Sequence, residues 1–339
     1  MDGKKKRPLL LLRLLLAVIM LASFAAPLFP PEGGGGEAAV RGYTCVLELW
    51  HIDLFEGGTG SRADFLSRRA VDYRKTRPGV FVLVRSVTET ELISKLSEGV
   101  LPDLFSFSPG IGEKLLPYLA EYGASGYEAS LKPSVMRSGK SYALPWCKGG
   151  YAFIAFTDAL RASGASEEGF LALPFDSKLA DKHGNLLVAG YAAYNSPLAA
   201  ARAAGFKGNL PEEKPTQYEA YREFYSRRAP VLLGTQRDLM RLENASLSGA
   251  VPPYSVSPVG GYTDLITAIG ICSATDYADE ADGFARYLLT DGVQSKLTGI
   301  GMLSVTGLKL YSDKGRAALE QALSDGYSAP NLFLVPSMP

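Results

Sequence analysis

The chain has 339 residues and no formal net charge, and 47% of its residues are hydrophobic. Because residues 1–25 hold five basic side chains and one acidic side chain, the rest of the chain carries a charge near −4. This charge argues against nucleic acid or an anionic membrane surface as the main partner, and the roughly 300 residues after position 42 are enough for two lobes.

Residues 1–30 have the layout of a secretory signal, with a basic start followed by an apolar run over 14–29. We expect a cleaved signal peptide. The alternative is an uncleaved signal anchor, because about 20 apolar residues would be available if Arg13 reached the lipid headgroups. In both cases the protein is expected to be exported, either to the periplasm or as a chain tethered to the outer face of the cytoplasmic membrane. Residues 31–42, which include four consecutive glycines, are predicted to form a flexible linker.

The next stretch alternates short apolar runs with amphipathic helices. Strands and helices are predicted in turn over residues 45–50, 61–75, 80–87, 89–98 and 104–107. The second helix begins with the capping pair Thr88 and Glu91 and stops at Gly99. This βαβαβ order predicts a parallel sheet with right-handed crossovers. Asp103, just before the last of these strands, is expected to hold the strand end.

Signals are weaker in the second half of the chain. We predict that a second sheet begins with the apolar run 151–156, and that 251–261, rich in Pro, Ser and Gly, is a connection. Further strands are predicted at 229–233 and 265–271. Further helices are predicted at 198–204, 236–244, 277–288, 292–297 and 314–324.

Five short segments occur in the order found in a known family. They are Glu48-Leu49-Trp50-His51, Leu96-Ser97-Glu98-Gly99 with Leu101-Pro102-Asp103, Tyr142-Ala143-Leu144-Pro145-Trp146, Leu233-Gly234-Thr235-Gln236-Arg237-Asp238, and Ala285-Arg286-Tyr287-Leu288-Leu289-Thr290. Behind an export signal, they make the chain resemble the extracellular solute-binding proteins of ABC importers, the family 1 group that includes maltose-binding protein and other sugar binders. The resemblance covers about residues 45–335. It implies an α/β, two-lobed periplasmic-binding-protein fold (type II), with two parallel-core sheets, flanking helices and a hinge.

The resemblance also implies how the chain is divided. Lobe one would contain residues 43–108 and 262–302, and lobe two residues 111–260 and 305–339, with crossings near 108–110, 259–262 and 301–305. A solute, expected to be a sugar, would be trapped between the lobes of a monomer, and ABC permease subunits would be the protein partner. The chain departs from the family in a short 160–215 region and in lacking a lipobox.

Sugar sites need aromatic platforms and groups that make paired hydrogen bonds. Trp50 and Trp146 are the only tryptophans and end strands where the family lines its cleft, so we expect them to stack on a ligand. The alternative for each ring is packing under its lobe. Asp53 and Glu56, in the loop after the first strand, are expected to hydrogen-bond ligand hydroxyls, whereas His51 is left open.

The remaining candidates lie at the expected crossings or where a helix opens. They are Phe107, Ser108, Tyr151, Gln236, Arg237 and Tyr262. A helix start with free N–H groups beside a guanidinium suits a polar or anionic group. The alternative role for Arg237 is an ion pair with Asp238 or Glu243.

Catalysis is not expected. The chain has only two histidines, His51 and His183, no Gly-x-Ser-x-Gly nucleophile elbow and no phosphate-binding loop. Its three cysteines, at 45, 147 and 272, are too far apart for a disulfide framework or zinc knuckle, so buried thiols and no cofactor are predicted. Two functions besides solute capture stay open: a membrane-tethered sensor or interaction module with the same fold, and a glycosidase using Asp53 with Glu56.

Overall fold

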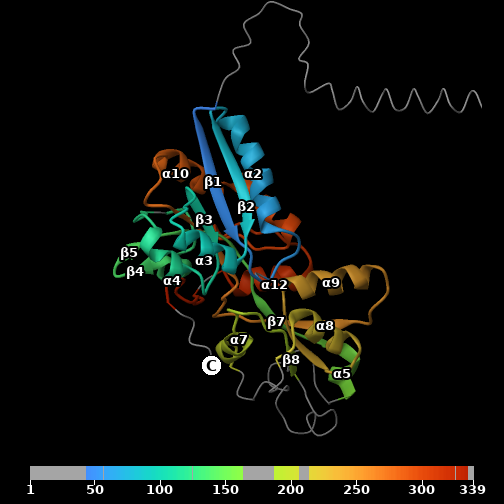
Figure 1. Cartoon of the computed structure of the whole chain (residues 1–339). Coiled ribbons are helices and arrows are strands. Elements are labelled where there is room, and N and C mark those ends of the chain that lie inside the picture. The colour runs from blue at the N-terminus through green and yellow to red at the C-terminus, as the bar shows by residue number, and fades with distance from the viewer. Residues whose placement is uncertain are drawn as a thin grey trace, which may run out of the picture. The chain divides into compact units, whose positions relative to one another are not determined.

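The first sheet has five strands in the order β2-β1-β3-β11-β6 (Figure 1). Strands β1 (Cys45–Ile52), β2 (Val80–Val87) and β3 (Leu104–Phe107) are parallel, which confirms the predicted βαβαβ order. Strand β11 (Ile266–Ile271) runs antiparallel to both β3 and β6 (Leu144–Lys148). The computed structural model describes residues 43–55, 57–123, 125–162, 187–205, 214–324 and 326–334. The expected signal segment, linker, Glu56 and His183 lie outside these residues.

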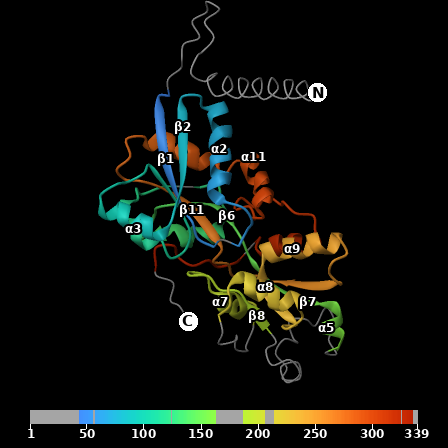
Figure 2. The same cartoon turned by 45° about the vertical axis from the view of Figure 1, so that its right-hand side comes forward.

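Local capping explains the helices between these strands. In α2 (Arg62–Thr76) the Ser61 side chain accepts a hydrogen bond from the Asp64 N–H at 3.1 Å, and α3 (Glu89–Ser97) is capped by Thr88. Helix α2 packs against β2 and lies beside it in both views (Figures 1 and 2). The Asp103 carboxylate accepts a hydrogen bond from the Glu48 N–H at 2.7 Å, so it holds the strand end as predicted.

The second sheet has four strands in the order β10-β7-β9-β8. They are β10 (Tyr254–Pro258), β7 (Tyr151–Phe156), β9 (Val231–Thr235) and β8 (Leu187–Ala189). Only β8 and β9 are parallel, so this sheet is mixed, whereas a parallel core had been expected for both. The prediction of a connection over 251–261 is wrong for β10, because an edge strand can accommodate proline at its end.

Helices flank the second sheet. They are α5 (Thr157–Ala162), α7 (Pro197–Ala203), α8 (Gln217–Tyr225), α9 (Gln236–Leu247) and α12 (Lys314–Ala322), and Figure 2 shows α7, α8 and α9 around this sheet. The other described elements are α4 (Gly112–Leu115), η1 (Leu116–Tyr118), η2 (Ala129–Val135), β4 (Met136–Arg137), β5 (Lys140–Ser141), α10 (Ala278–Tyr287), α11 (Asp291–Gln294) and η3 (Ser295–Ile300). Among the described residues, no helix is long and apolar enough to cross a membrane.

The chain first passes from one sheet to the other between β6 and β7, at Gly149 and Gly150. This differs from the expected crossing at 108–110, because the chain after β3 stays with the first sheet and forms its edge strand β6. Residues 144–148 therefore pair with the first sheet, although 111–260 was assigned to lobe two. Side chains would not fit at this crossing: a Cβ on Gly149 would lie 2.2 Å from the Gln236 amide nitrogen.

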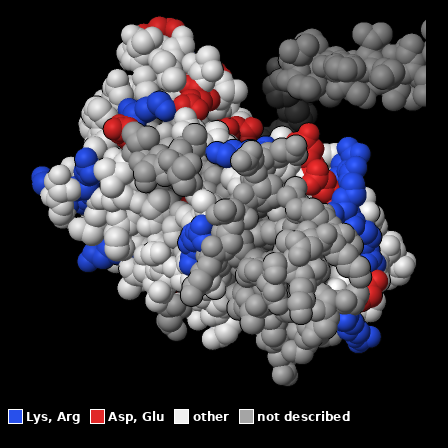
Figure 3. Space-filling model, turned by 90° about the horizontal axis from the view of Figure 1, so that it is seen from below, with Lys and Arg blue, Asp and Glu red and all other residues white. Residues whose placement is uncertain are grey.

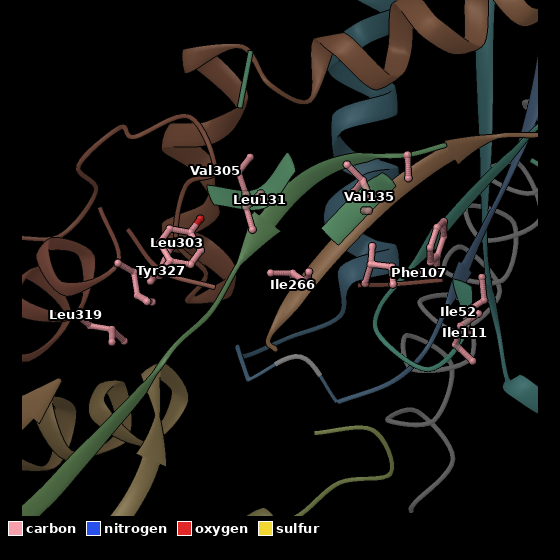
Figure 4. Packing of buried hydrophobic residues seen from close by; sticks show 14 of the residues in the cluster. Ile52, Phe107, Ile111, Leu131, Val135, Ile266, Leu303, Val305, Leu319 and Tyr327 are labelled. Carbon is pink, nitrogen blue, oxygen red and sulfur yellow. The ribbon is translucent and has the colours of Figure 1, made fainter. Parts of the chain in front are cut away.

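The hydrophobic core is continuous between the sheets. One cluster joins Phe107 of β3 to Ile154 of β7 and Leu319 of α12, and Figure 4 shows Ile266 between the two groups of side chains. Cys45, Cys147 and Cys272 are buried thiols that form no disulfide, as predicted. The two sides therefore share packed apolar surface, which stabilises this arrangement.

Candidate functional site

The candidate site lies where β1 and β3 end. Ligands of open α/β sheets bind beyond the carboxyl ends of parallel strands. Two groups of segments meet here, and together we call them the seam. The segments that follow these strands are residues 53–55, 57–60 and 108–110. The segments from the second-sheet side are residues 190–196 and 234–237. The Arg237 N–H donates to the Gly57 carbonyl at 3.1 Å, and the Thr235 hydroxyl to the same oxygen at 3.3 Å. The seam is thus bridged by direct hydrogen bonds.

A small cavity remains in the seam. Its walls are Leu54, Phe55, Ser108 and Pro109 on one side and Ala192, Ala193, Tyr194 and Asn195 on the other. Its volume of about 30 Å³ leaves room for only a few water molecules. A sugar ring does not fit this space, so a solute of that size requires the two sides to separate.

Gln236 opens α9 and is fully buried. Its amide oxygen accepts a hydrogen bond from the Gly150 N–H at 2.9 Å, and its amide nitrogen lies 3.2 Å from the sulfur of Met302. The side chain therefore ties the start of α9 to the first crossing. Its amide is occupied by protein partners in this arrangement.

Arg237 is half-buried, and its Nε is buried without a hydrogen-bond partner. Burial lowers the pKa of this guanidinium, and the positive charge of Arg241 adds to the effect. The two carboxylates that could have paired with it have other contacts: Asp238 lies 3.4 Å from Arg241, and Glu243 accepts from the Tyr254 hydroxyl at 3.0 Å. A half-buried guanidinium with an unpartnered Nε–H is suited to a polar ligand group.

Both tryptophans are core residues. Trp50 is 1% exposed, packs edge-on against Phe105 and donates to the Glu48 carboxylate at 2.9 Å. Trp146 is fully buried, and its ring stacks on Phe65 with centroids 5.6 Å apart. Neither ring offers a face to a ligand in this arrangement. The geometry therefore favours packing over the expected stacking role for both residues.

Three further candidates are also held by protein partners. Phe107 is fully buried and packs against Phe333, with ring centroids 6.1 Å apart. The Tyr151 hydroxyl donates to the Asp264 carboxylate at 2.6 Å, and burial beside this carboxylate raises the pKa of both Tyr151 and Tyr262. These side chains therefore belong to the protein interior next to the seam. Asp264 was missed because a single carboxylate in a connection carries no sequence signal.

The loop residues differ from one another in placement. Ser108 lines the cavity, and its hydroxyl lies 3.4 Å from that of Thr267. Asp53 is exposed beside the seam, whereas Glu56 lies outside the described residues. His51 is buried with its Nδ1 3.1 Å from the Ser106 hydroxyl, so it is a strand-end packing residue. Ser108 therefore lies in the seam segment after β3, and Gln236 and Arg237 lie in the segment at the start of α9.

Residues that the sequence did not single out also meet here. Tyr194, from the connection between β8 and α7, hydrogen-bonds Glu89 at the start of α3, and Lys114 of α4 binds the same carboxylate. The described residues contain no group of three or more His, Cys, Asp or Glu side chains arranged to hold a metal ion. In this arrangement the Gln236 amide and the Tyr194 hydroxyl are already hydrogen-bonded to protein groups.

Comparison with solved structures identifies the architecture, whereas no family model and no curated protein matches the sequence. The sugar-binding protein MalE from Xanthomonas citri superposes with a TM-score of 0.62 at 15% identity, over 84% of this chain and 86% of that chain. The chain has the fold of the extracellular solute-binding proteins. This finding confirms the two-lobed α/β class expected from the sequence.

Other solute-binding proteins match over similar lengths. The GacH receptor of Streptomyces glaucescens, solved with acarbose, has a TM-score of 0.59 at 14% identity, over 86% of this chain and 89% of that chain. A family 1 extracellular solute-binding protein from Bifidobacterium longum subsp. infantis has a TM-score of 0.59 at 15% identity, over 87% and 90%. These matches are binding proteins by description, and at such identities they establish the fold and leave the solute to be found.

Proposed function

We propose that this protein is an extracytoplasmic solute-binding protein that captures a carbohydrate or a related polar solute and delivers it to an ABC permease. The observation that carries the proposal is the seam, which lies at the carboxyl ends of β1 and β3 and faces the start of α9 across a two-glycine crossing. The structures of GacH with acarbose and of a Listeria monocytogenes protein with cycloalternan support a saccharide as the solute class.

The mechanism would be a population shift between open and closed lobes. A solute that contacts both sides of the seam stabilises the closed form, and the permease would recognise that form. Arg237 would bind solute oxygens, with Ser108 and Asp53 on the opposite side. Lys and Arg side chains and Asp and Glu side chains both occur on the face shown in Figure 3.

A thermal-shift screen tests the proposal. The protein is heated with mono- and oligosaccharides, polyols, sugar phosphates and short peptides. A solute present at 100 times its dissociation constant should stabilise the folded state by about 2.7 kcal/mol. A stabilising saccharide supports the proposal, whereas a folded protein that responds to none of the panel contradicts it.

Replacing Arg237 by alanine is expected to weaken binding of the saccharide found in that screen. A hydrogen bond to a charged group contributes about 1.5–3 kcal/mol, which corresponds to a loss of roughly 10- to 150-fold in affinity. Isothermal titration calorimetry measures the change. The matched control is Arg241→Ala, one turn further along α9, where the guanidinium contacts Asp238. Equal affinities for Arg237→Ala and the unmodified protein would remove Arg237 from the site.

A membrane-tethered sensor with the same fold is the second candidate function. It is favoured by the nearly filled seam, since an interaction module that binds no solute does not need to open. Intact-mass measurement of the membrane fraction separates the two. A retained Met1 supports the tethered sensor, and a chain that starts near Ala26 supports the free binding protein.

A further inference from the structure

We propose that Tyr194 and the segment 190–196 form an internal lock that holds the seam closed without a solute, so that a solute must displace this segment in order to bind. The inference rests on the proposed function only in taking the seam as the solute site. The lock itself is a property of the ligand-free chain, and it can be tested without any solute.

The lock bridges the two sides through one carboxylate. The Tyr194 hydroxyl donates to the Glu89 carboxylate at 2.7 Å, and the Lys114 ammonium donates to the same oxygen at 2.7 Å. Lys114 also lies 5.7 Å from the centre of the tyrosine ring. Tyr194 belongs to the second-sheet side, whereas Glu89 begins α3 and Lys114 lies in α4. Hydrogen bonds to a charged acceptor are stronger than neutral ones, so this contact favours closure.

Gly110 lies directly against the ring of Tyr194. Its φ of +90° is a conformation that glycine adopts readily, and a Cβ built there would lie 2.2 Å from the ring of Tyr194. The ring therefore packs directly on the backbone just after β3. This position lies beside the cavity, at the end of the parallel strands where a solute is expected.

Both ends of the segment are anchored to other parts of the protein. The Tyr191 N–H donates to the Pro215 carbonyl at 2.9 Å, and the Ser196 N–H donates to the Asp264 carboxylate at 2.6 Å. Asp264 is itself held by the Tyr151 hydroxyl. Between these anchors, residues 192–195 form one wall of the cavity and leave room for only a few water molecules. The segment thus occupies the space that a sugar would need.

A lock of this kind lowers the apparent affinity for the solute. The apparent dissociation constant is the intrinsic constant divided by the fraction of molecules that can bind. Because Glu89 and Lys114 are partly exposed, with side chains 29% and 36% accessible, the effect of their contact is reduced by solvent. Removing the tyrosine hydroxyl is expected to increase the apparent affinity about tenfold.

The test compares ligand-free proteins by small-angle X-ray scattering. Tyr194→Phe removes the hydroxyl and keeps the ring, and Glu89→Gln removes the charge from the other side. Both variants are expected to have a larger radius of gyration than the unmodified protein. The matched control is Tyr191→Phe, in the same segment but bound to the second-sheet side, and it is expected to scatter like the unmodified protein. Radii unchanged in both seam variants, or an equal increase in the control, would overturn the lock.

Titration with acarbose as the probe separates the lock from the proposed function. About tenfold tighter binding by Tyr194→Phe than by the unmodified protein supports both. If neither protein binds acarbose or any other solute but Tyr194→Phe expands, the lock stands and the proposed function fails. If the unmodified protein binds a saccharide and Tyr194→Phe neither expands nor binds more tightly, the function stands and the lock is wrong.

Discussion

Replacing Lys148 by alanine is expected to lower the free energy of unfolding by about 3–5 kcal/mol, because it removes one partner of a buried ion pair. The Lys148 side chain is 3% exposed and contacts the Glu128 carboxylate. Its ammonium also donates to the Leu323 carbonyl at 2.8 Å and to the Tyr327 hydroxyl at 3.3 Å. Burial lowers the pKa of Lys148, and Glu128 opposes that shift. Alanine would leave the Glu128 carboxylate, whose side chain is 12% exposed, with the Tyr327 hydroxyl as a donor but without a counter-charge.

Urea denaturation measures this loss, read as a shift in the midpoint at constant slope. The matched control is Lys140→Ala, whose partner Glu121 is exposed, so little change is expected. A Lys148→Ala protein as stable as the control would show that the network at the first crossing is not a major source of stability. Lys148→Met tests the charge alone, because methionine keeps most of the apolar stem.

The free energy of unfolding is expected to fall by about 3 kcal/mol between pH 6.5 and pH 4 because of His51 alone. Burial lowers the pKa of His51 from 6.5 to about 4. The negative charge of Asp53 raises this pKa, whereas the positive charge of Arg62 lowers it further. Above pH 6.5 the imidazole is neutral in both the folded and the unfolded protein, so it does not change the free energy of unfolding. As the pH falls, the unfolded chain takes up a proton that the folded protein does not, so acid favours unfolding.

The measurement is the free energy of unfolding at several pH values for the unmodified protein and for His51→Asn. The difference between the two curves should narrow as the pH falls from 6.5 to 4, because asparagine does not titrate. His183→Gln removes the other histidine and should leave the contribution of His51 unchanged. Parallel curves for the unmodified protein and His51→Asn would show that His51 titrates normally in the folded state.

Elements whose signals are local were predicted well. Strands β2, β3 and β7 have the predicted bounds, and α2 and α9 begin within one residue of the expected positions. Their alternation, capping residues and stop signals act over three or four neighbours, which a sequence displays directly. Strand β10 was missed because its proline and serine residues suggest a connection, and only pairing with β7 makes it a strand.

The candidate binding residues stay a prediction, and the structure shows where they lie. Ser108 and Gln236 directly follow strands and Arg237 comes one residue later, and strand ends can be read from the sequence. The roles expected for Trp50 and Trp146 depended on which face of each ring stays open. That is decided by Phe105 and Phe65, which come from other segments of the chain.

By itself, the sequence determined the alternation of strands and helices, the buried thiols and the two-lobed α/β class, because these depend on local periodicity and on the order of segments. Only the tertiary structure decided which sheet takes β6, where the chain crosses between the sheets and which segment fills the seam. Tyr194 and Glu89 are 105 positions apart, and nothing in the sequence around either residue indicates that the two are in contact. Contacts of this kind arise from packing between distant segments, so they become visible only when the chain is folded.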